Sequence, residues 1–336
     1  MLVINADNVN DALTQGIAIM CEHGEPLNSR AGQTLEIPMP VATVYRKPWE
    51  RVLISRVRDA NPFFHLMESL WILAGRKDVK FLSEFNKRMS EYSDDGKVFN
   101  APYGYRLRNG IGYDNDQLAT VIRTLKNDPN SRQAVCQIWD EEDLHRQTKD
   151  KACNMQIVFR IRSGYLYMTV NNRSNDMVWG AYGANVVQFS MIQEYVAAHL
   201  GLPLGTYTQV SNSFHVYTEG PGGEVWDRLI NNFELHESPY DNVNNATYMV
   251  EEDMDDFEYD LKQFFNIYDE FGLKELGEMN CWKSRYFNGL ILPVLCCYLV
   301  HKSSGANHAI NYLTHIVADD WHFACRDWLL NRVKSL

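Results

Sequence analysis

Cys153 stands at the start of a hairpin pattern and is a candidate nucleophile. The segment NMQIVFRIR (154–162) alternates apolar and polar residues, Ser-Gly at 163–164 supplies a turn, and YLYMTVNN (165–172) alternates again. Charged residues at 149–151 precede the cysteine. Most free cysteines are small buried core residues, but a partly exposed thiol beside cations has a lowered pKa and becomes a nucleophile. We therefore expect Cys153 to work as a thiolate.

The far end of this hairpin carries the polar segment NNRSND (171–176). Such a segment is usually an exposed turn. An Arg-Ser pair is also a good phosphate ligand, because the guanidinium is a forked donor and the hydroxyl adds a hydrogen bond. A turn at 163–164 places residues near 173 opposite residue 153. We expect Arg173 to bind an anion and to stabilise the Cys153 thiolate.

Glu68 interrupts the apolar helix pattern PFFHLMESLWILAGR (62–76). Burying a carboxylate is costly, so such a residue is paired, placed at a cleft, or catalytic with a raised pKa.

Four other residues could bind a ligand but are ambiguous alone. Arg30 lies in the glycine-containing loop SRAGQT, and Arg132 lies in DPNSRQ. Either could be a phosphate clamp or an ordinary surface residue. His215 and Tyr217 lie two apart in SFHVY, on one face of a strand pattern, where they could hold a hydroxyl or form a half-buried edge.

Composition limits the partners of the chain. Its 336 residues are 45% hydrophobic and carry a net charge of −11, so any bound anion should be small and held by a few local arginines rather than a nucleic acid. The N-terminus lacks a signal-peptide layout, and the longest apolar run, 290–300, is too short to cross a membrane. Seven cysteines without metal-ligand spacing favour a reducing compartment and no metal site.

The elements that would position these residues alternate between helices and strands, which indicates an α/β or α+β fold. Strands are predicted at 133–139, 154–162, 165–172 and 206–211, and helices at 1–25, 62–76, 117–127 and 185–201. Residues 25–40 are predicted to be a loop entering a short strand, and 93–116 a loop. After Tyr217 the pattern is helical throughout.

In order and spacing, these motifs resemble the core of the thymidylate synthase superfamily. PNSRQAVCQIWD, ACNMQIVFRI, NNRSNDMVWGAYGANVVQFSMIQEY and SNSFHVY resemble its strand, nucleophile, Arg-Ser-x-Asp, asparagine and His-x-Tyr motifs. FHLMESLWILAG, NAPYGYRLR and NSRAGQT are similar to its glutamate helix, Tyr-Gly motif and phosphate loop. The resemblance implies a mixed sheet packed by helices in a sheet-to-sheet homodimer. Residues 1–217 would form this core, and 218–336 a divergent helical extension packed on the same domain.

The resemblance also implies a role for each matching residue. Cys153 matches the nucleophile that adds to C6 of a pyrimidine nucleotide. Glu68 and Tyr103 match groups that organise proton transfers, and Asp176 matches the aspartate between pterin and pyrimidine. The matching phosphate ligands are Arg30, Arg173, Ser174 and Arg132, the last contributed by the neighbouring subunit. Asn185 matches the ligand of the base, and His215 and Tyr217 match the ligands of the sugar 3′-hydroxyl.

The family uses 5,10-methylenetetrahydrofolate as co-substrate and no metal. Hydride transfer to the transferred carbon gives a methyl group, whereas water gives a hydroxymethyl group. The synthases shield this carbon with a tryptophan, but no tryptophan lies between Trp71 and Trp139, and Met89 falls near the expected position. The chain also lacks the short closing tail of the synthases. It therefore resembles the phage-type deoxynucleotide hydroxymethylases more than the methylating synthases.

The sequence leaves alternatives open for the base that the protein accepts and for the reaction that it catalyses. Asn185 can donate to O4 and accept from N3–H of uracil, which favours dUMP, but one extra residue in WGAYGAN leaves its register open. Asn154 stands where the synthases have a histidine. The rival hypotheses are a dCMP hydroxymethylase, a thymidylate synthase proper, a thiol hydrolase using Cys153 and His215, and an inactive structural homologue. We expect a cytoplasmic protein, in the host cytoplasm if a phage encodes it.

Overall fold

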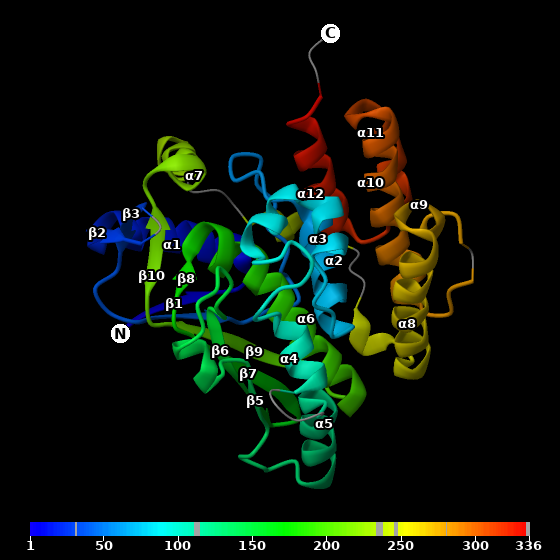
Figure 1. The fold of residues 1–336 in the computed structure, drawn as a ribbon, viewed down its shortest axis with the longest axis horizontal. Coiled ribbons are helices and arrows are strands. Elements are labelled where there is room, and N and C mark those ends of the chain that lie inside the picture. The colour runs from blue at the N-terminus through cyan, green and yellow to red at the C-terminus, as the bar shows by residue number, and fades with distance from the viewer. Residues whose placement is uncertain (31, 111–114, 233–237, 245–247, 280, 334–336) are drawn as a thin grey trace.

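Two mixed β-sheets form the centre of the fold in the computed structural model, which describes residues 1–336 except 31, 111–114, 233–237, 245–247, 280 and 334–336 (Figure 1). Within the described residues, one sheet has six strands in the order β1-β4-β9-β7-β6-β5, and the other has four in the order β2-β3-β10-β8. The strands of the larger sheet are β1 (Leu2–Ala6), β4 (Val41–Tyr45), β5 (Val135–Gln137), β6 (Asn154–Arg162), β7 (Tyr165–Asn172) and β9 (Leu204–Ser211). Those of the smaller sheet are β2 (Glu25–Ser29), β3 (Gly32–Glu36), β8 (Asn175–Asp176) and β10 (Phe214–Tyr217). Both sheets combine parallel and antiparallel pairs, so the fold is of the mixed α/β class.

The hairpin β6–β7 has the predicted turn. Ser163 and Gly164 have φ angles of 51° and 79°, the left-handed values that a two-residue hairpin turn requires. Arg162 pairs with Tyr165 and Asn154 with Asn172. The next step along this register brings the backbone N–H of Arg173 to the carbonyl oxygen of Cys153, at 2.9 Å. The predicted juxtaposition of residues 153 and 173 is therefore confirmed.

Two strands of the larger sheet continue into the smaller one after a short break. β7 is followed by Arg173, Ser174 and then β8, and β9 is followed by Asn212, Ser213 and then β10. The breaks are joined by backbone hydrogen bonds from Asn212 to Asn172, from Ser213 to Arg173 and from Asn175 to Ser213, at 2.9–3.2 Å. The polar segment NNRSND is thus fixed at the junction of the sheets.

Two buried helices, α2 (Pro62–Leu73) and α6 (Asn185–Leu200), pack on each other beside this junction. Every residue of α2 is buried, and α6 is buried from Asn185 to Ala197. The Asn61 side chain caps α2, and Gly201 ends α6 in the left-handed conformation that glycine adopts without strain. The remaining helices of this half are α1 (Val9–His23), α3 (Val79–Phe85), α4 (Tyr103–Asn109) and α5 (Gln117–Asn127).

The chain after Tyr217 is helical in its described parts, with α7 (Gly220–Asn231), α8 (Met254–Phe271), α9 (Leu273–Leu276), α10 (Leu292–Ser304), α11 (Ala306–Tyr312) and α12 (Asp319–Leu330). In Figure 1, α2 and α3 lie between the sheets and helices α8–α11. Phe81 of α3 packs on Tyr268 of α8 with ring centroids 4.9 Å apart, and Phe63 of α2 packs on Trp328 of α12 at 5.3 Å. No helix in the described parts is both long and apolar enough to span a bilayer.

Several predicted elements were wrong. Residues 2–6 form strand β1, and the helix begins only at Val9, where the Asn8 side chain accepts hydrogen bonds from the backbone N–H groups of Asn10 and Asp11. Strand β1 pairs with β4, which lies far along the chain, so the local sequence pattern does not predict β1. The predicted loop at 25–40 begins with strand β2, which pairs with the short strand β3 in an antiparallel hairpin. The predicted loop 93–116 contains helix α4, which buries Gly104, Arg106 and Leu107.

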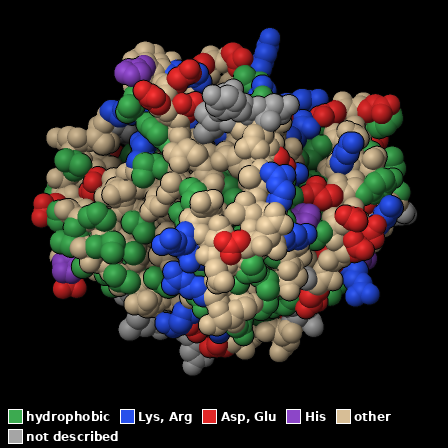
Figure 2. All heavy atoms as spheres, turned by 90° about the horizontal axis from the view of Figure 1, so that it is seen from below, with side chains coloured by type: hydrophobic (Ala, Val, Ile, Leu, Met, Phe, Trp, Pro, Cys, Tyr) green, Lys and Arg blue, Asp and Glu red, His purple; other side chains and the backbone are tan. Residues whose placement is uncertain are grey.

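On the face drawn in Figure 2, Lys and Arg side chains are interspersed with Asp, Glu and apolar side chains rather than gathered into an extended basic surface. This pattern agrees with the acidic net charge.

Candidate active site

A cavity of about 1180 Å³ lies beside α2 and α6. Its lining includes six of the residues expected at the site, namely Glu68, Met89, Tyr103, Asp176, Asn185 and Tyr217. Cys153, Asn154, Arg173, Ser174, His215, Arg30 and Arg132 are not in that lining. Cys153 nevertheless adjoins the cavity through Tyr103, whose hydroxyl oxygen accepts a hydrogen bond from the Cys153 backbone N–H at 3.4 Å.

The thiol of Cys153 lies beside the guanidinium of Arg173. The Nη2 of Arg173 is 3.7 Å from Sγ, and the backbone oxygen of Lys151 is 3.9 Å from Sγ. Arg173 also donates from Nε to the carbonyl oxygen of Ala152 at 2.8 Å and from Nη2 to that of Lys151 at 3.1 Å. The arginine therefore holds the loop before Cys153 and faces the thiol at the same time.

The predicted lowering of the Cys153 pKa is wrong for the free protein. Burial raises the pKa of the thiol, and the opposing effects of Arg173 and Arg30 do not compensate for it. A half-buried sulfur loses part of the hydration that its thiolate needs, and the sequence does not show this burial. In the free protein the thiol is therefore predominantly protonated at neutral pH.

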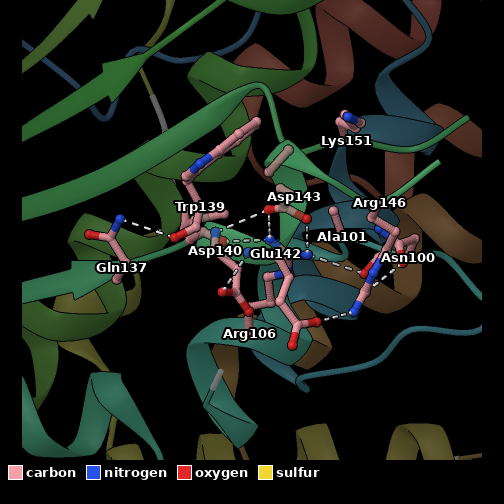
Figure 3. Close-up of polar contacts among 12 residues, drawn as sticks. Asn100, Ala101, Arg106, Gln137, Trp139, Asp140, Glu142, Asp143, Arg146 and Lys151 are labelled. Carbon is pink, nitrogen blue, oxygen red and sulfur yellow. Dashed lines mark hydrogen bonds and ion pairs between the residues drawn. The ribbon is translucent and has the colours of Figure 1, made fainter. Parts of the chain in front are cut away.

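A network of polar contacts fixes α4 against the chain that leads to Cys153 (Figure 3). Arg106 of α4 forms a buried ion pair with Asp143, with N–O distances of 2.5 and 2.9 Å, and donates to the carbonyl oxygen of Ile138. Asp150 accepts a hydrogen bond from the backbone N–H of Ala101 at 2.7 Å. These contacts hold Tyr103, at the start of α4, against Cys153.

Glu68 of α2 is a buried acid on the cavity wall. Burial raises its pKa to about 8, and a hydrogen bond with the side chain of Gln188 on α6 offsets only part of the rise. The Oε2 of Glu68 and the Oε1 of Gln188 are buried without a hydrogen-bond partner among the described residues. Glu68 is thus predominantly protonated at neutral pH. The two oxygens without partners beside it could accept hydrogen bonds from a ligand or a water molecule.

Asp176, His215 and Tyr217 meet on the smaller sheet. His215 of β10 pairs in register with Asp176 of β8, and its ring is perpendicular to that of Tyr217 with centroids 5.6 Å apart. The Nδ1 of His215 is 3.1 Å from the hydroxyl of Ser213. Asp176 accepts from the backbone N–H of Trp179 at 2.5 Å through Oδ1, its Oδ2 has no partner among the described residues, and burial raises its pKa.

Asn185 begins α6 and is 9% exposed. It follows the π-helical segment Met177–Ala184, which contains the non-helical residues Tyr182 and Gly183. The chain is therefore kinked just before Asn185, which lines the cavity.

The expected phosphate ligands are only partly assembled. Ser174 is half-buried beside Arg173, and Arg30 is exposed at the β2–β3 turn, close enough to affect the pKa of Cys153. Arg132 is exposed near the edge strand β5 and makes no hydrogen bond or ion pair with the described residues. Asn154 is fully buried next to Cys153. Neither the oxygen nor the nitrogen of its amide makes a hydrogen bond of normal geometry with the described residues. The Asn154 side chain nevertheless acts to lower the pKa of Tyr103, against the larger rise that burial causes.

Sequence reasoning missed several cavity residues. Gln188 was detectable as a polar residue inside an apolar helix, and His65 precedes Glu68 by one helical turn. Burial and the neighbouring Arg58 lower the pKa of His65 to about 3, so its imidazole is neutral. Trp328 and Arg332 also line the cavity, and no sequence signal connects them to it. Among the described residues, no cluster of His, Cys, Asp and Glu has the arrangement of a metal site.

Comparison with known proteins defines the family. A model of the thymidylate synthase family matches residues 21–263. The deoxyuridylate hydroxymethyltransferase of Pseudomonas phage M6 is 37% identical over 343 residues, which cover 99% of this chain and 95% of that protein. The chain belongs to the thymidylate synthase family and is a transferase of one-carbon groups.

Two further relatives differ in how much of the chain they match. The deoxyuridylate hydroxymethyltransferase of Bacillus phage SP01 is 38% identical over 271 residues, covering 75% of this chain and 70% of that protein. A putative thymidylate synthase of Methanosarcina barkeri is 29% identical over 229 residues, covering 68% of this chain and 93% of that protein.

Proposed function

We propose that this protein converts dUMP to 5-hydroxymethyl-dUMP with 5,10-methylenetetrahydrofolate as the one-carbon donor. The observation that carries this function is the position of the Cys153 thiol, 3.7 Å from Arg173 and joined through Tyr103 to a cavity that holds the protonated acid Glu68. The names of the two phage relatives support the same base and product.

The Cys153 thiol first loses its proton to water. Its thiolate then adds to C6 of the uracil, and the electron pair of the C5–C6 double bond moves toward the C4 carbonyl, so C5 becomes nucleophilic. When bound, 5,10-methylenetetrahydrofolate supplies the carbon that C5 receives. Glu68, with a pKa of about 8, can deliver and recover protons at the C4 oxygen near neutral pH. Loss of the C5 proton then supplies the electron pair that breaks the bond between the transferred carbon and the folate nitrogen, so tetrahydrofolate would leave and an exocyclic methylene would remain on the Cys153 adduct. Water then adds to this methylene and loses a proton, and expulsion of Cys153 from C6 restores the ring.

The contacts of the nucleotide follow from where the side chains lie. Arg173, Ser174 and Arg30 surround the sheet junction beside Cys153 and would hold the phosphate. His215 and Tyr217, adjacent on β10, would hold the 3′-hydroxyl. Asn185 on the cavity wall would contact the base.

The cavity also has room and chemistry for a folate. Its lining includes the aromatic side chains of Trp179, Phe64, Phe85 and Trp328, which suit stacking on aromatic rings. Arg88 lines the same cavity and could face a carboxylate, whereas Arg332 is paired with Asp59. The Oδ2 of Asp176, which has no partner among the described residues, is available to a pterin N–H group.

Water addition is favoured over methylation by the polar wall around Glu68. Gln188 and the neutral imidazole of His65 line the cavity with Glu68, and two of these side chains have buried oxygens without partners among the described residues. Such groups typically bind water. Met89, which falls near the sequence position expected for the shielding tryptophan, lines the cavity. Methylation to dTMP remains the second candidate, because the family model and the archaeal relative carry that name.

We also propose a sheet-to-sheet homodimer in which Arg132 reaches the phosphate of the partner subunit. Alternate residues of three neighbouring strands of the larger sheet are partly exposed, namely Val158, Arg160, Tyr167, Thr169, Thr208 and Val210. The Nε of Arg160 is buried without a partner among the described residues. A second copy packed on this face would cover these residues.

Residues 218–336 would form an extension of the core, because α8 and α12 pack on α3 and α2 and α12 contributes to the cavity. If a phage encodes the protein, the reaction would occur in the host cytoplasm.

Tritium release from [5-³H]dUMP in the presence of methylenetetrahydrofolate tests the reaction. The wild-type protein should release tritium and yield a product with the mass of 5-hydroxymethyl-dUMP, with no absorbance rise from dihydrofolate. A Cys153→Ala variant should release none. A folded wild-type protein that releases no tritium from dUMP or dCMP would exclude the enzyme function, and a dTMP product with dihydrofolate would identify a synthase.

A further inference from the structure

We infer that Asn175 and Gln209 determine the choice of uracil over cytosine by fixing the orientation of the Asn185 amide. This inference rests on the proposed function, because it assigns the base that the same site accepts. Neither residue is in the cavity lining, and both are 1% exposed, so they act through Asn185 as positioning residues.

Hydrogen bonds connect Gln209 to Asn175 and Asn175 to Asn185, and we call this chain of contacts the relay. Its fixed end is Gln209 of β9. Its Nε2 donates to the backbone oxygen of Ala181 at 2.9 Å and to the hydroxyl of Tyr45 at 2.7 Å. A backbone carbonyl can only accept a hydrogen bond, so the atom of Gln209 that faces Ala181 must be the amide nitrogen. The Tyr45 hydroxyl donates to the same carbonyl at 3.1 Å, so it must accept from Gln209. The Oε1 of Gln209 therefore points the other way, toward Asn175.

The orientation then passes through Asn175. Its Nδ2 donates to the Oε1 of Gln209 and to the hydroxyl of Ser211, both at 3.0 Å. Its Oδ1 accepts from the Nδ2 of Asn185, also at 3.0 Å. Reversing the Asn185 amide would set two carbonyl oxygens against each other in a buried place, at the cost of an unsatisfied acceptor on each.

Gly180 leaves room for this contact. A Cβ atom at residue 180 would lie 2.7 Å from the Oδ1 of Asn175 and 3.2 Å from the Nδ2 of Asn185. A side chain at residue 180 would therefore displace the contact between Asn175 and Asn185.

With its amide fixed, Asn185 offers the cavity its Oδ1, which accepts no hydrogen bond from the described residues, and the second proton of Nδ2. Uracil presents an N3–H donor and an O4 acceptor, which match both atoms. Neutral cytosine presents an N3 acceptor and an N4 donor, which oppose both. A site that hydrogen-bonds one such pattern rejects the other strongly, since its buried groups are left unpaired.

Calorimetric titration with dUMP and with dCMP, without folate, measures this discrimination. Both nucleotides carry the same phosphate and sugar, so the ratio of their dissociation constants isolates the base. We expect wild-type protein to bind dUMP at least about 100-fold more tightly. Gln209→Met and Asn175→Ala free the Asn185 amide to turn and should reduce the ratio by about tenfold or more. Asn175→Asp keeps an acceptor for Asn185 and should preserve the preference for dUMP.

Gln193→Met is the matched control. Gln193 is another buried glutamine, whose amide donates to the backbone oxygens of Leu166 and Gly205 away from the cavity. Its loss should lower stability and leave the ratio unchanged. Equal binding of both nucleotides by the wild type, or an unchanged ratio in folded Gln209→Met and Asn175→Ala, would overturn the inference. Binding with the expected ratio but without tritium release would instead remove the proposed reaction and leave the relay standing.

Discussion

The carboxyl group of Glu68 has a pKa of about 8, close to the value that suits proton transfer near neutral pH. If its protonated form donates to the base, kcat/KM should fall as the pH rises through about 8, and Glu68→Gln should remove that limb of the profile. The measurement is the pH dependence of tritium release. Activity that rises through the same range in the wild type but not in Glu68→Gln would show that Glu68 acts as a base.

The same group makes stability depend on pH. An ordinary glutamate loses its proton near 4.5, whereas the folded protein retains it to about 8, so between these values the unfolded state binds fewer protons. The free energy of unfolding should therefore decrease with rising pH in this window, by at most about 1.4 kcal/mol per pH unit for one proton. Urea unfolding of the wild type and of Glu68→Gln at several pH values checks the sign.

Cys153 should alkylate slowly in the free protein at neutral pH, because burial raises its pKa. Arg173 acts against that rise, so Arg173→Met should shift the pH dependence of iodoacetamide modification to higher pH. Arg173→Lys should shift this pH dependence part of the way back toward that of the wild type. Mass spectrometry of the peptide that contains Cys153 separates it from the other cysteines. An unchanged profile in Arg173→Met would show that the guanidinium does not influence the thiol.

At the scale of elements, α4 depends on a close approach to α2. A Cβ atom at residue 104 would lie only 2.2 Å from the backbone oxygen of Ile72, and backbone cannot move aside as a side chain can. Gly104→Ala should destabilise the protein by about 1–3 kcal/mol or more and should reduce activity by displacing Tyr103. Gly289→Ala is the control, since its Cβ would meet nothing within 4 Å. Equal melting temperatures for the two variants would contradict this packing.

Elements with a strong local period were predictable from the sequence, and those defined by distant partners were not. The β6–β7 hairpin has its own alternation and turn, and α2 and α6 have long apolar patterns, so all three were predicted together with Cys153, Arg173 and Glu68. Strand β1 exists because β4 lies beside it. The burial that raises the Cys153 pKa and the relay from Gln209 to Asn185 likewise depend on contacts between separate elements.

For the whole molecule, the proposed dimer predicts complementation between inactive chains. Arg132→Glu should disable the partner's phosphate site, and Cys153→Ala should disable its own. Mixed and refolded together, the two variants should regain up to about a quarter of wild-type activity, because half of the dimers are mixed and each of these has one intact site. A mixture as inactive as its components would place Arg132 outside the partner's site. Mixing Cys153→Ala with Glu68→Gln controls for the method, since both residues belong to one subunit's site and no intact site can form.

The packing of α12 on α2 makes the cavity depend on the synthesis of α12. A ribosome synthesises α12 after every other element that it touches, and Trp328 covers Phe63 on the helix that carries Glu68. A chain released before Asp319 would expose this aromatic surface and lack one wall of the cavity. Premature termination should therefore yield a chain that proteases and chaperones recognise, rather than a weakened enzyme with an open cavity.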